Sequence, residues 1–249
     1  MAAEPDPLSA LSDEQDRLEE VLGSLDESAW RHASACPGWT ITDVVLHLAQ
    51  TEEGVTTSIT GEGLTALPSV EASSVDELMA GWVQQDRATP PPEVFERWRV
   101  ARRAALDALR SADPSRALTW VAAPLKPRTL ATTRLSEHWI HALDITGPLG
   151  VPYPDTDRLW HIARLAHRTL PYAFMQAGAG EAPSVRAVLR SPGGEEWSFG
   201  SDDAQCRVEG TAGEFCRVAG RRLAPEEAPT LTAQGERAKD VLSLIRTYA

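Results

Sequence analysis

Residues 133–145 read TRLSEHWIHALDI, and the interpretation of the whole chain depends on this stretch. Side chains three or four positions apart share one face of an α-helix, because each residue turns the helix by about 100°. The polar members share such a face: Arg134, Glu137, His141 and Asp144. The opposite side is apolar. This stripe indicates either a solvated face held by i,i+3 and i,i+4 pairs or half of a metal site.

A metal site needs ligands from a second helix. Glu137 and His141 lie one turn apart, and carboxylate oxygen and imidazole nitrogen are both zinc ligands. The best third candidate is His47 in DVVLHLAQ, for which a buried core histidine is the alternative interpretation. Three protein ligands leave the fourth tetrahedral position open, as in catalytic zinc sites. Asp144 would then accept a hydrogen bond from an imidazole, while Arg134 is expected to pair with Glu137 or with a domain interface.

Composition excludes several classes of partner. The 249 residues are 42% hydrophobic and 24% charged, with a net charge of −12 and a pI near 5.0. Nucleic acids and anionic membranes both attract a Lys/Arg-rich surface, so we expect neither as a partner. No run of 18 apolar residues and no basic, apolar leader occurs. The three cysteines form no CxxC pair, which favours a reducing cytosol. We expect a cytoplasmic monomer or homodimer that acts on a small-molecule substrate.

Apolar periodicity divides the chain into two parts. Four amphipathic helices are expected first, at 11–25, from Thr40 onward, at 92–110 and at 129–145. Short alternating runs then predict strands, at 184–190, 196–200, 206–210 and 229–235, and helices are expected at 155–175, 211–221 and 236–248. SPGG at 191–194 is a hairpin signal. The sequence therefore predicts an α+β protein, with a four-helix bundle over 1–152 and a smaller α+β domain over 153–249.

Three stretches together resemble one protein family. They are ACPGWTITDVVLHLAQTE at 35–52, LTWVAAPLKPRTLATTRLSEHWIHALDI at 118–145 and VEGTAGEFCRVAGRR at 208–222. They are similar to the mycothiol-dependent maleylpyruvate isomerase-like branch of the DinB superfamily. The resemblance covers most of the chain. It implies a DinB-like four-helix bundle followed by a small domain like a sterol-carrier protein.

The resemblance also implies site residues. In the family a divalent ion, usually zinc, is held at the positions of His47, Glu137 and His141. An arginine near the end of the second domain is needed by the isomerase, and Arg222 or its neighbour Arg221 matches it. The alternative for these two arginines is a favourable interaction of cations with a helix C-terminus.

Three functions remain open at this stage. The resemblance implies a zinc- and mycothiol-dependent isomerase or S-transferase, in which a metal-held thiolate attacks an electrophilic carbon and the arginine binds a carboxylate or an enolate. The match is better to a sub-branch than to the isomerase itself, so maleylpyruvate is not assumed as the substrate. The second function is a thiol-independent metal hydrolase or acid–base enzyme, with Asp144 moving a proton. The third is a non-catalytic small-molecule-binding protein.

Overall fold

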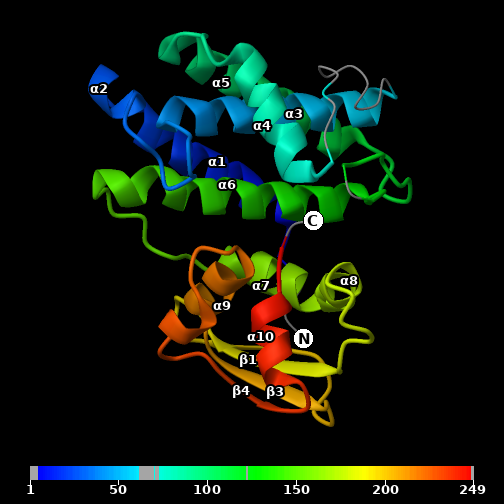
Figure 1. Cartoon of the computed structure of the whole chain (residues 1–249). Helices are drawn as coiled ribbons and strands as arrows, with labels where there is room; N and C mark the ends of the chain where they lie inside the picture. The colour runs from blue at the N-terminus through cyan, green and yellow to red at the C-terminus, as the bar shows by residue number, and fades with distance from the viewer. Residues whose placement is uncertain (1–4, 62–69, 71–72, 122, 248–249) are drawn as a thin grey trace. The chain divides into compact units, whose positions relative to one another are not determined.

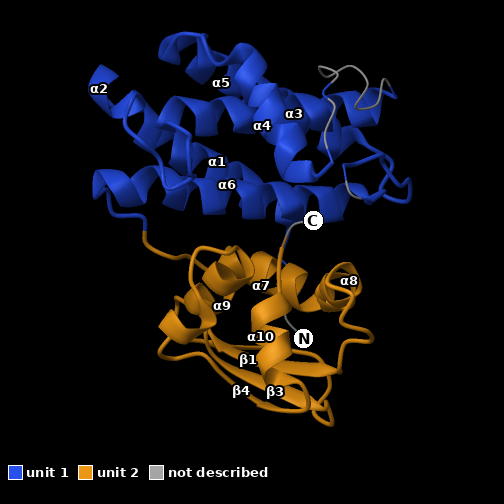
Figure 2. Ribbon diagram, in the orientation of Figure 1, with its two compact units in different colours: residues 1–153 blue, residues 154–249 orange. Residues whose placement is uncertain are grey.

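The computed structural model describes residues 5–61, 70, 73–121 and 123–247. The chain forms two compact units, residues 1–153 and 154–249 (Figure 2). The sequence placed the division after residue 152. The first unit is helical, and the second contains a four-stranded sheet with helices (Figure 1). The α+β class expected from the sequence is confirmed.

Among its described residues, the first unit contains four long helices and two shorter ones. Their bounds are α1 Pro7–Gly23, α2 Glu27–Trp30, α3 Ile41–Thr60, α4 Val75–Asp86, α5 Pro91–Ser111 and α6 Pro127–Leu149. Helix α3 packs on α5, α4 and α6, while α1 packs on α6 and α5. Leucine, valine and tryptophan side chains fill the interior of this unit, among them Leu18, Val45, Trp98 and Trp139. Val45 lies on α3 and Trp139 on α6, so the core includes a face of each of these two helices.

Three details of this unit differ from the sequence-based prediction. Helix α1 begins at Pro7, where Asp6 caps it, rather than at residue 11. Helix α6 continues beyond residue 145 and through Pro148 to Leu149, where Gly150 in the left-handed conformation caps it. Helix α4 was not predicted, and it buries Met79 and Trp82 in a small apolar cluster.

The second unit is a mixed sheet with helices on one face (Figure 1). Its elements are α7 Leu159–Arg168, α8 Leu170–Gln176, β1 Val185–Arg190, β2 Glu196–Phe199, β3 Cys206–Thr211, α9 Ala212–Ala219, a 3-10 turn Pro225–Glu227, β4 Thr232–Gly235 and α10 Ala238–Leu244. The strand order is β2-β1-β3-β4, with only β1 and β3 parallel. The predicted hairpin at 191–194 joins β1 to β2. The predicted helix at 155–175 is divided into α7 and α8, because Pro171 starts a new helix.

Sheet burial follows the period of two expected of strands. Val185, Ala187 and Leu189 of β1 are buried, while Arg186 and Val188 between them are half-buried. Helices α7, α9 and α10 contact the strands and cover the apolar side chains. On the opposite face Arg190 and Arg207 are exposed, as expected for a mostly antiparallel sheet with one solvated side.

Candidate metal centre

The first ligand candidate is positioned by the start of α3. Thr40 and Asp43 form a reciprocal capping box: the Asp43 carboxylate accepts the Thr40 N–H at 2.8 Å, and the Thr40 hydroxyl accepts the Asp43 N–H at 3.2 Å. Arg87 pairs with Asp43 at 2.8 Å and ties α4 to this turn. A helix start fixed in this way sets the rotation of the helix. His47, two turns further along, is consequently turned into the interior, where it is 5% exposed.

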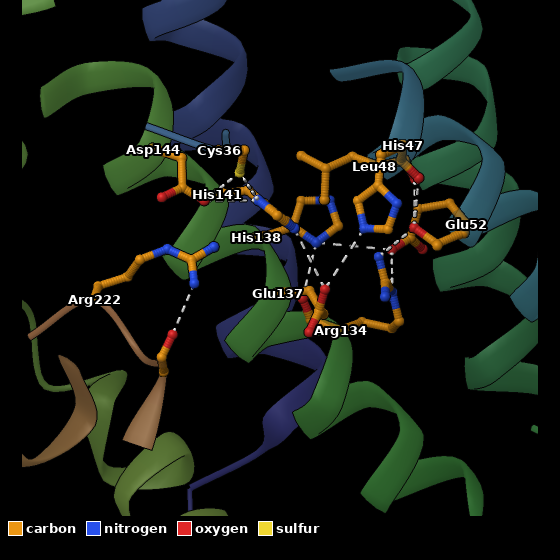
Figure 3. Close-up of polar contacts among 12 residues, drawn as sticks. Cys36, His47, Leu48, Glu52, Arg134, Glu137, His138, His141, Asp144 and Arg222 are labelled. Carbon is orange, nitrogen blue, oxygen red and sulfur yellow. Dashed lines mark hydrogen bonds and ion pairs between the residues drawn. The ribbon is translucent and has the colours of Figure 1, made fainter. Parts of the chain in front are cut away.

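Two imidazoles from different helices approach the same carboxylate oxygen (Figure 3). Oε2 of Glu137 lies 3.7 Å from Nε2 of His47 and 3.5 Å from Nε2 of His141. The ligand atoms of the three residues all lie within 4.8 Å of one another. The Glu137 side chain is 22% exposed, so the cluster is accessible on that side. The structure thus brings together all three residues that the sequence put forward as ligands.

The second nitrogen of His141 is held by Asp144. Nδ1 of His141 lies 2.9 Å from Oδ2 of Asp144. The Nδ1–H donates to this carboxylate, which orients the ring so that Nε2 faces Glu137. The thiol of Cys36 donates to the same Oδ2 at 3.1 Å. This matches the role that the sequence suggested for Asp144, and it adds Cys36, which the sequence analysis did not assign to the site.

A proline inside α6 explains how the turn at Cys36 is attached. In a regular helix the carbonyl of Asp144 would accept from the N–H of residue 148, but Pro148 has no N–H. The Asp144 carbonyl instead accepts the N–H of Ala35 at 2.9 Å. A second hydrogen bond, from the Cys36 N–H to the Ser34 hydroxyl, measures 3.1 Å. The CPGW turn is therefore fixed beside His141, and its Trp39 ring lies 5.4 Å from that of His47.

Burial and neighbouring charge set the protonation of the three residues. Burial lowers the pKa of His47 to about 4, although Glu137 opposes this. Burial alone would raise the pKa of Glu137, but hydrogen bonds from His141 and His47 hold it well below its usual value. Burial also disfavours the charged form of His141, and the hydrogen bond to Asp144 outweighs this and raises its pKa well above the ordinary value. In the absence of an ion, His141 is therefore the protonated member of the cluster, and it lies between the carboxylates of Glu137 and Asp144.

A buried layer of polar groups lies beside the cluster. Nδ1 of His138 donates to the Arg134 carbonyl at 2.9 Å, and its Nε2 accepts from Nε1 of Trp98 at 3.3 Å. His138 therefore stays neutral, and burial together with the charge of Arg134 lowers its pKa well below the ordinary value. Arg134 itself is 2% exposed and pairs with Glu52.

These positions rule out the solvated interpretation of the stripe. Arg134, His141 and Asp144 are buried, and Arg134 pairs with Glu52 of α3 at 2.8 Å instead of with Glu137. The expectation for Arg134 was wrong because its partner is separated by 82 residues along the chain. Glu52 and Cys36 were missed for the same reason: both lie in the stretch 35–52 that the sequence had already singled out, but their role depends on contacts between elements.

The two candidate arginines belong to the second unit, just after α9. Arg222 N–H donates to the Arg217 carbonyl at 2.8 Å, and Arg221 N–H donates to that of Val218 at 3.1 Å. These bonds form a Schellman motif at the helix end. Arg221 adopts a φ of 58°, and its guanidinium donates to the Ser243 carbonyl. Arg222 donates to the Gly220 carbonyl at 2.9 Å.

The residues of the cluster fit a divalent ion. Metal–ligand distances of about 2.0–2.2 Å place the ligand atoms of a tetrahedral ion roughly 3.3–3.5 Å apart. The two measured separations from Glu137, 3.5 and 3.7 Å, are close to this. Two neutral imidazoles and one carboxylate suit zinc, although the ligand type alone also suits other transition metals.

Comparison with known proteins identifies the family. Residues 11–146, more than half of the chain, match the family model described as mycothiol maleylpyruvate isomerase N-terminal domain. The chain belongs to this family. The matched range contains all three ligand candidates together with Cys36 and Asp144, and it ends within α6. The resemblance seen in the sequence is thereby confirmed.

Two curated relatives match nearly the whole chain. Two uncharacterized proteins of Mycobacterium tuberculosis strains are 34% identical over 250 residues, covering 99% of this chain and 97% of theirs. The crystal structure of the mycothiol-dependent maleylpyruvate isomerase is similar, with a TM-score of 0.63 and 17% identity over 92% of both chains. A mutant of that enzyme gives a TM-score of 0.62 at 16% identity, again over 92% of both chains. At such identities the structures show a shared fold.

A helix that crosses a bilayer needs about 20 mostly apolar residues. In the parts of the chain that the structure describes, no helix is both long and apolar enough to cross a membrane.

Proposed function

We propose that this protein is a metal-dependent enzyme that uses a low-molecular-weight thiol such as mycothiol to isomerise or S-conjugate a small electrophilic metabolite. His47, Glu137 and His141 would hold the ion, for which zinc is the first candidate. The observation that carries the proposal is the approach of two Nε2 atoms to one Glu137 oxygen, at 3.5 and 3.7 Å. Membership of a family named for a mycothiol-dependent isomerase supports the choice of thiol.

A bound divalent ion would supply a Lewis acid that favours the thiolate form of the thiol cosubstrate. The chain's own residues prepare the site. Asp144 holds the His141 ring with Nε2 toward Glu137, and burial keeps His47 neutral, so that its nitrogen can act as a ligand. Glu137 remains ionised and accessible from one side.

The reaction class follows from thiol chemistry. Addition of a thiolate to an activated alkene converts its double bond into a single bond, which can rotate. The resulting enolate either expels the thiolate, which gives the isomer, or takes up a proton and keeps the thiol, which gives a conjugate. To Arg222, or to its neighbour Arg221, we assign the binding of a substrate carboxylate, because a guanidinium binds that group in a bidentate manner.

The test begins with metal content. We expect the wild type to bind a first equivalent of a divalent ion and His47→Ala, Glu137→Ala and His141→Ala to lose this equivalent, with the helical content unchanged. His32→Ala, which changes an exposed histidine, is the matched control and keeps the ion. Wild-type protein without metal, or metal retained in all three variants, would overturn the proposal.

The thiol is tested on the metal-loaded protein. Mycothiol is expected to add a sulfur-to-cobalt charge-transfer band to the spectrum that the cobalt-substituted wild type gives without thiol, and to add none to that of the Glu137→Ala variant. An unchanged spectrum in the wild type would reject the thiol cosubstrate while leaving the metal site intact.

A further inference from the structure

The imidazole of His141 has ligand atoms on both sides. Its Nε2 lies toward Glu137 and His47, and its Nδ1 lies toward Asp144 and Cys36 (Figure 3). The proposed function uses the first side only. On the second side, Cys36 Sγ, His141 Nδ1 and Asp144 Oδ2 all lie within 4.8 Å of one another.

We propose that Cys36, Asp144 and Nδ1 of His141 form a second metal position, which takes a thiophilic divalent ion such as zinc or cadmium. The position itself follows from these three side chains alone. Simultaneous binding of two ions on opposite sides of one imidazole rests in addition on the proposed function, because it requires the ion at His47, Glu137 and His141.

The separations agree with coordination of one ion. Asp144 Oδ2 lies 2.9 Å from His141 Nδ1 and 3.1 Å from Cys36 Sγ, and the sulfur lies 3.8 Å from Nδ1. Zinc bonds of about 2.0–2.3 Å place tetrahedral ligand atoms roughly 3.3–3.6 Å apart. Shifts of about half an ångström, within the reach of side-chain rotation, are therefore sufficient to admit an ion.

The donor set determines the class of ion. A thiolate, an imidazole and a carboxylate occur together at zinc sites, and the thiolate excludes magnesium and calcium, which bind oxygen ligands. The two acidic protons of the cluster, on the Cys36 sulfur and on Nδ1, both face Asp144 Oδ2. An ion that binds here replaces these two protons, which are released to solvent.

The site is held in place and remains accessible. Asp144 is buried on α6, whereas Cys36 is half-buried, so an ion can enter on the side of the thiol. The turn that carries Cys36 is fixed by the hydrogen bond from Ala35 N–H to the Asp144 carbonyl, and by the bond from Trp39 N–H to the Cys36 carbonyl at 3.1 Å. The hydrogen bond between Ala35 and Asp144 thus positions both the Cys36 thiol and the Asp144 carboxylate.

Charge also favours occupation of both positions. Four ligands would each carry one negative charge: Glu137, Asp144, the Cys36 thiolate and a bridging His141 imidazolate. This total balances two divalent ions. Because buried charge is stable only when it is compensated, the paired arrangement avoids the unbalanced charge that a second ion would otherwise introduce.

The test is a cobalt(II) titration of the full-length protein, followed by absorption and elemental analysis. We expect the wild type to bind a second equivalent that produces a sulfur-to-cobalt charge-transfer band. Cys36→Ser loses both that equivalent and the band, and Asp144→Asn weakens them. Cys206→Ala and Cys216→Ala, which change the other two cysteines, keep them. A wild type without the band, or a band that persists in Cys36→Ser, would overturn the proposal.

The same titration separates this inference from the proposed function. His47→Ala removes the first equivalent and leaves the Cys36-dependent band. If His47→Ala changes neither the number of ions nor the band, the proposed function fails and the Cys36 position stands. If Cys36→Ser changes nothing while His47→Ala removes the ion, the second position fails and the proposed function stands.

Discussion

Arg134 of α6 and Glu52 of α3 form an ion pair in the interior of the first unit, with Nε and Oε1 2.8 Å apart and both side chains almost fully buried. A second donor of Arg134 bonds to the Thr51 hydroxyl at 2.7 Å, and this hydroxyl donates to the His47 carbonyl at 2.8 Å. One guanidinium, one turn before Glu137, is thus linked to the backbone of His47. The pair therefore connects the two helices that carry the ligand candidates.

Removing the cation is expected to destabilise the protein. In Arg134→Met the Glu52 carboxyl is left buried without its partner, which costs about 3–5 kcal/mol at similar sites. Chemical denaturation monitored by circular dichroism measures the loss. The double variant Arg134→Met with Glu52→Gln is expected to recover part of it, because no unpaired charge remains. A loss below about 1 kcal/mol in the single variant would show that the pair does not stabilise this unit.

Asp144 is expected to affect metal affinity through His141. Asp144→Asn weakens the hydrogen bond that orients the ring, and loss of such an outer partner lowers metal affinity about 10–100-fold. Competition with a chromogenic chelator measures the affinity of the first equivalent. Asp155→Asn, which changes a carboxylate paired with Arg217 in the second unit, is the control with wild-type affinity. Equal affinity in both variants would contradict the role given to Asp144.

Histidines that are buried in the neutral form make the stability depend on pH. The pKa of His138 is far below its ordinary value of about 6.5, so the unfolded chain takes up this proton first as the pH falls. The contribution of neutral His138 to the free energy of unfolding is complete above about pH 6.5 and decreases by about 1.4 kcal/mol per pH unit below that pH. In metal-free protein, His138→Gln is expected to show a shallower decrease of the unfolding free energy between about pH 6.5 and 5 than the wild type. Parallel curves for the two proteins would refute this assignment.

The helical stripe shows what the sequence could and could not predict. Periodicity placed Glu137 and His141 on one face of their helix, and the structure brings His47 to them. Both placements could be predicted, because helix geometry fixes the first and the helix start at Thr40 is visible in the sequence. Periodicity could not predict that the same face is buried. The partner of Arg134 lies on another helix, and the contact of Cys36 with Asp144 depends on a carbonyl that Pro148 leaves available.

The end of α9 in the second unit also has a conformation that the sequence did not predict, and it permits a test of Arg221 and Arg222. Glycine normally occupies the left-handed position after a helix, yet here Gly220 has a φ of −83° and Arg221 has 58°. A residue with a Cβ in this conformation costs about 1 kcal/mol. We therefore expect Arg221→Gly to be more stable than Arg221→Ala by about 1 kcal/mol, since both variants lose the guanidinium and only glycine relieves the strain. Thermal denaturation of the two variants measures the difference, and equal stability would exclude strain at this position.

The same position separates the two arginines as candidates for substrate binding. If Arg222 binds the substrate carboxylate, Arg221→Gly retains the wild-type KM while Arg222→Lys raises it, because lysine cannot bind a carboxylate in a bidentate manner. The reverse result would assign that role to Arg221.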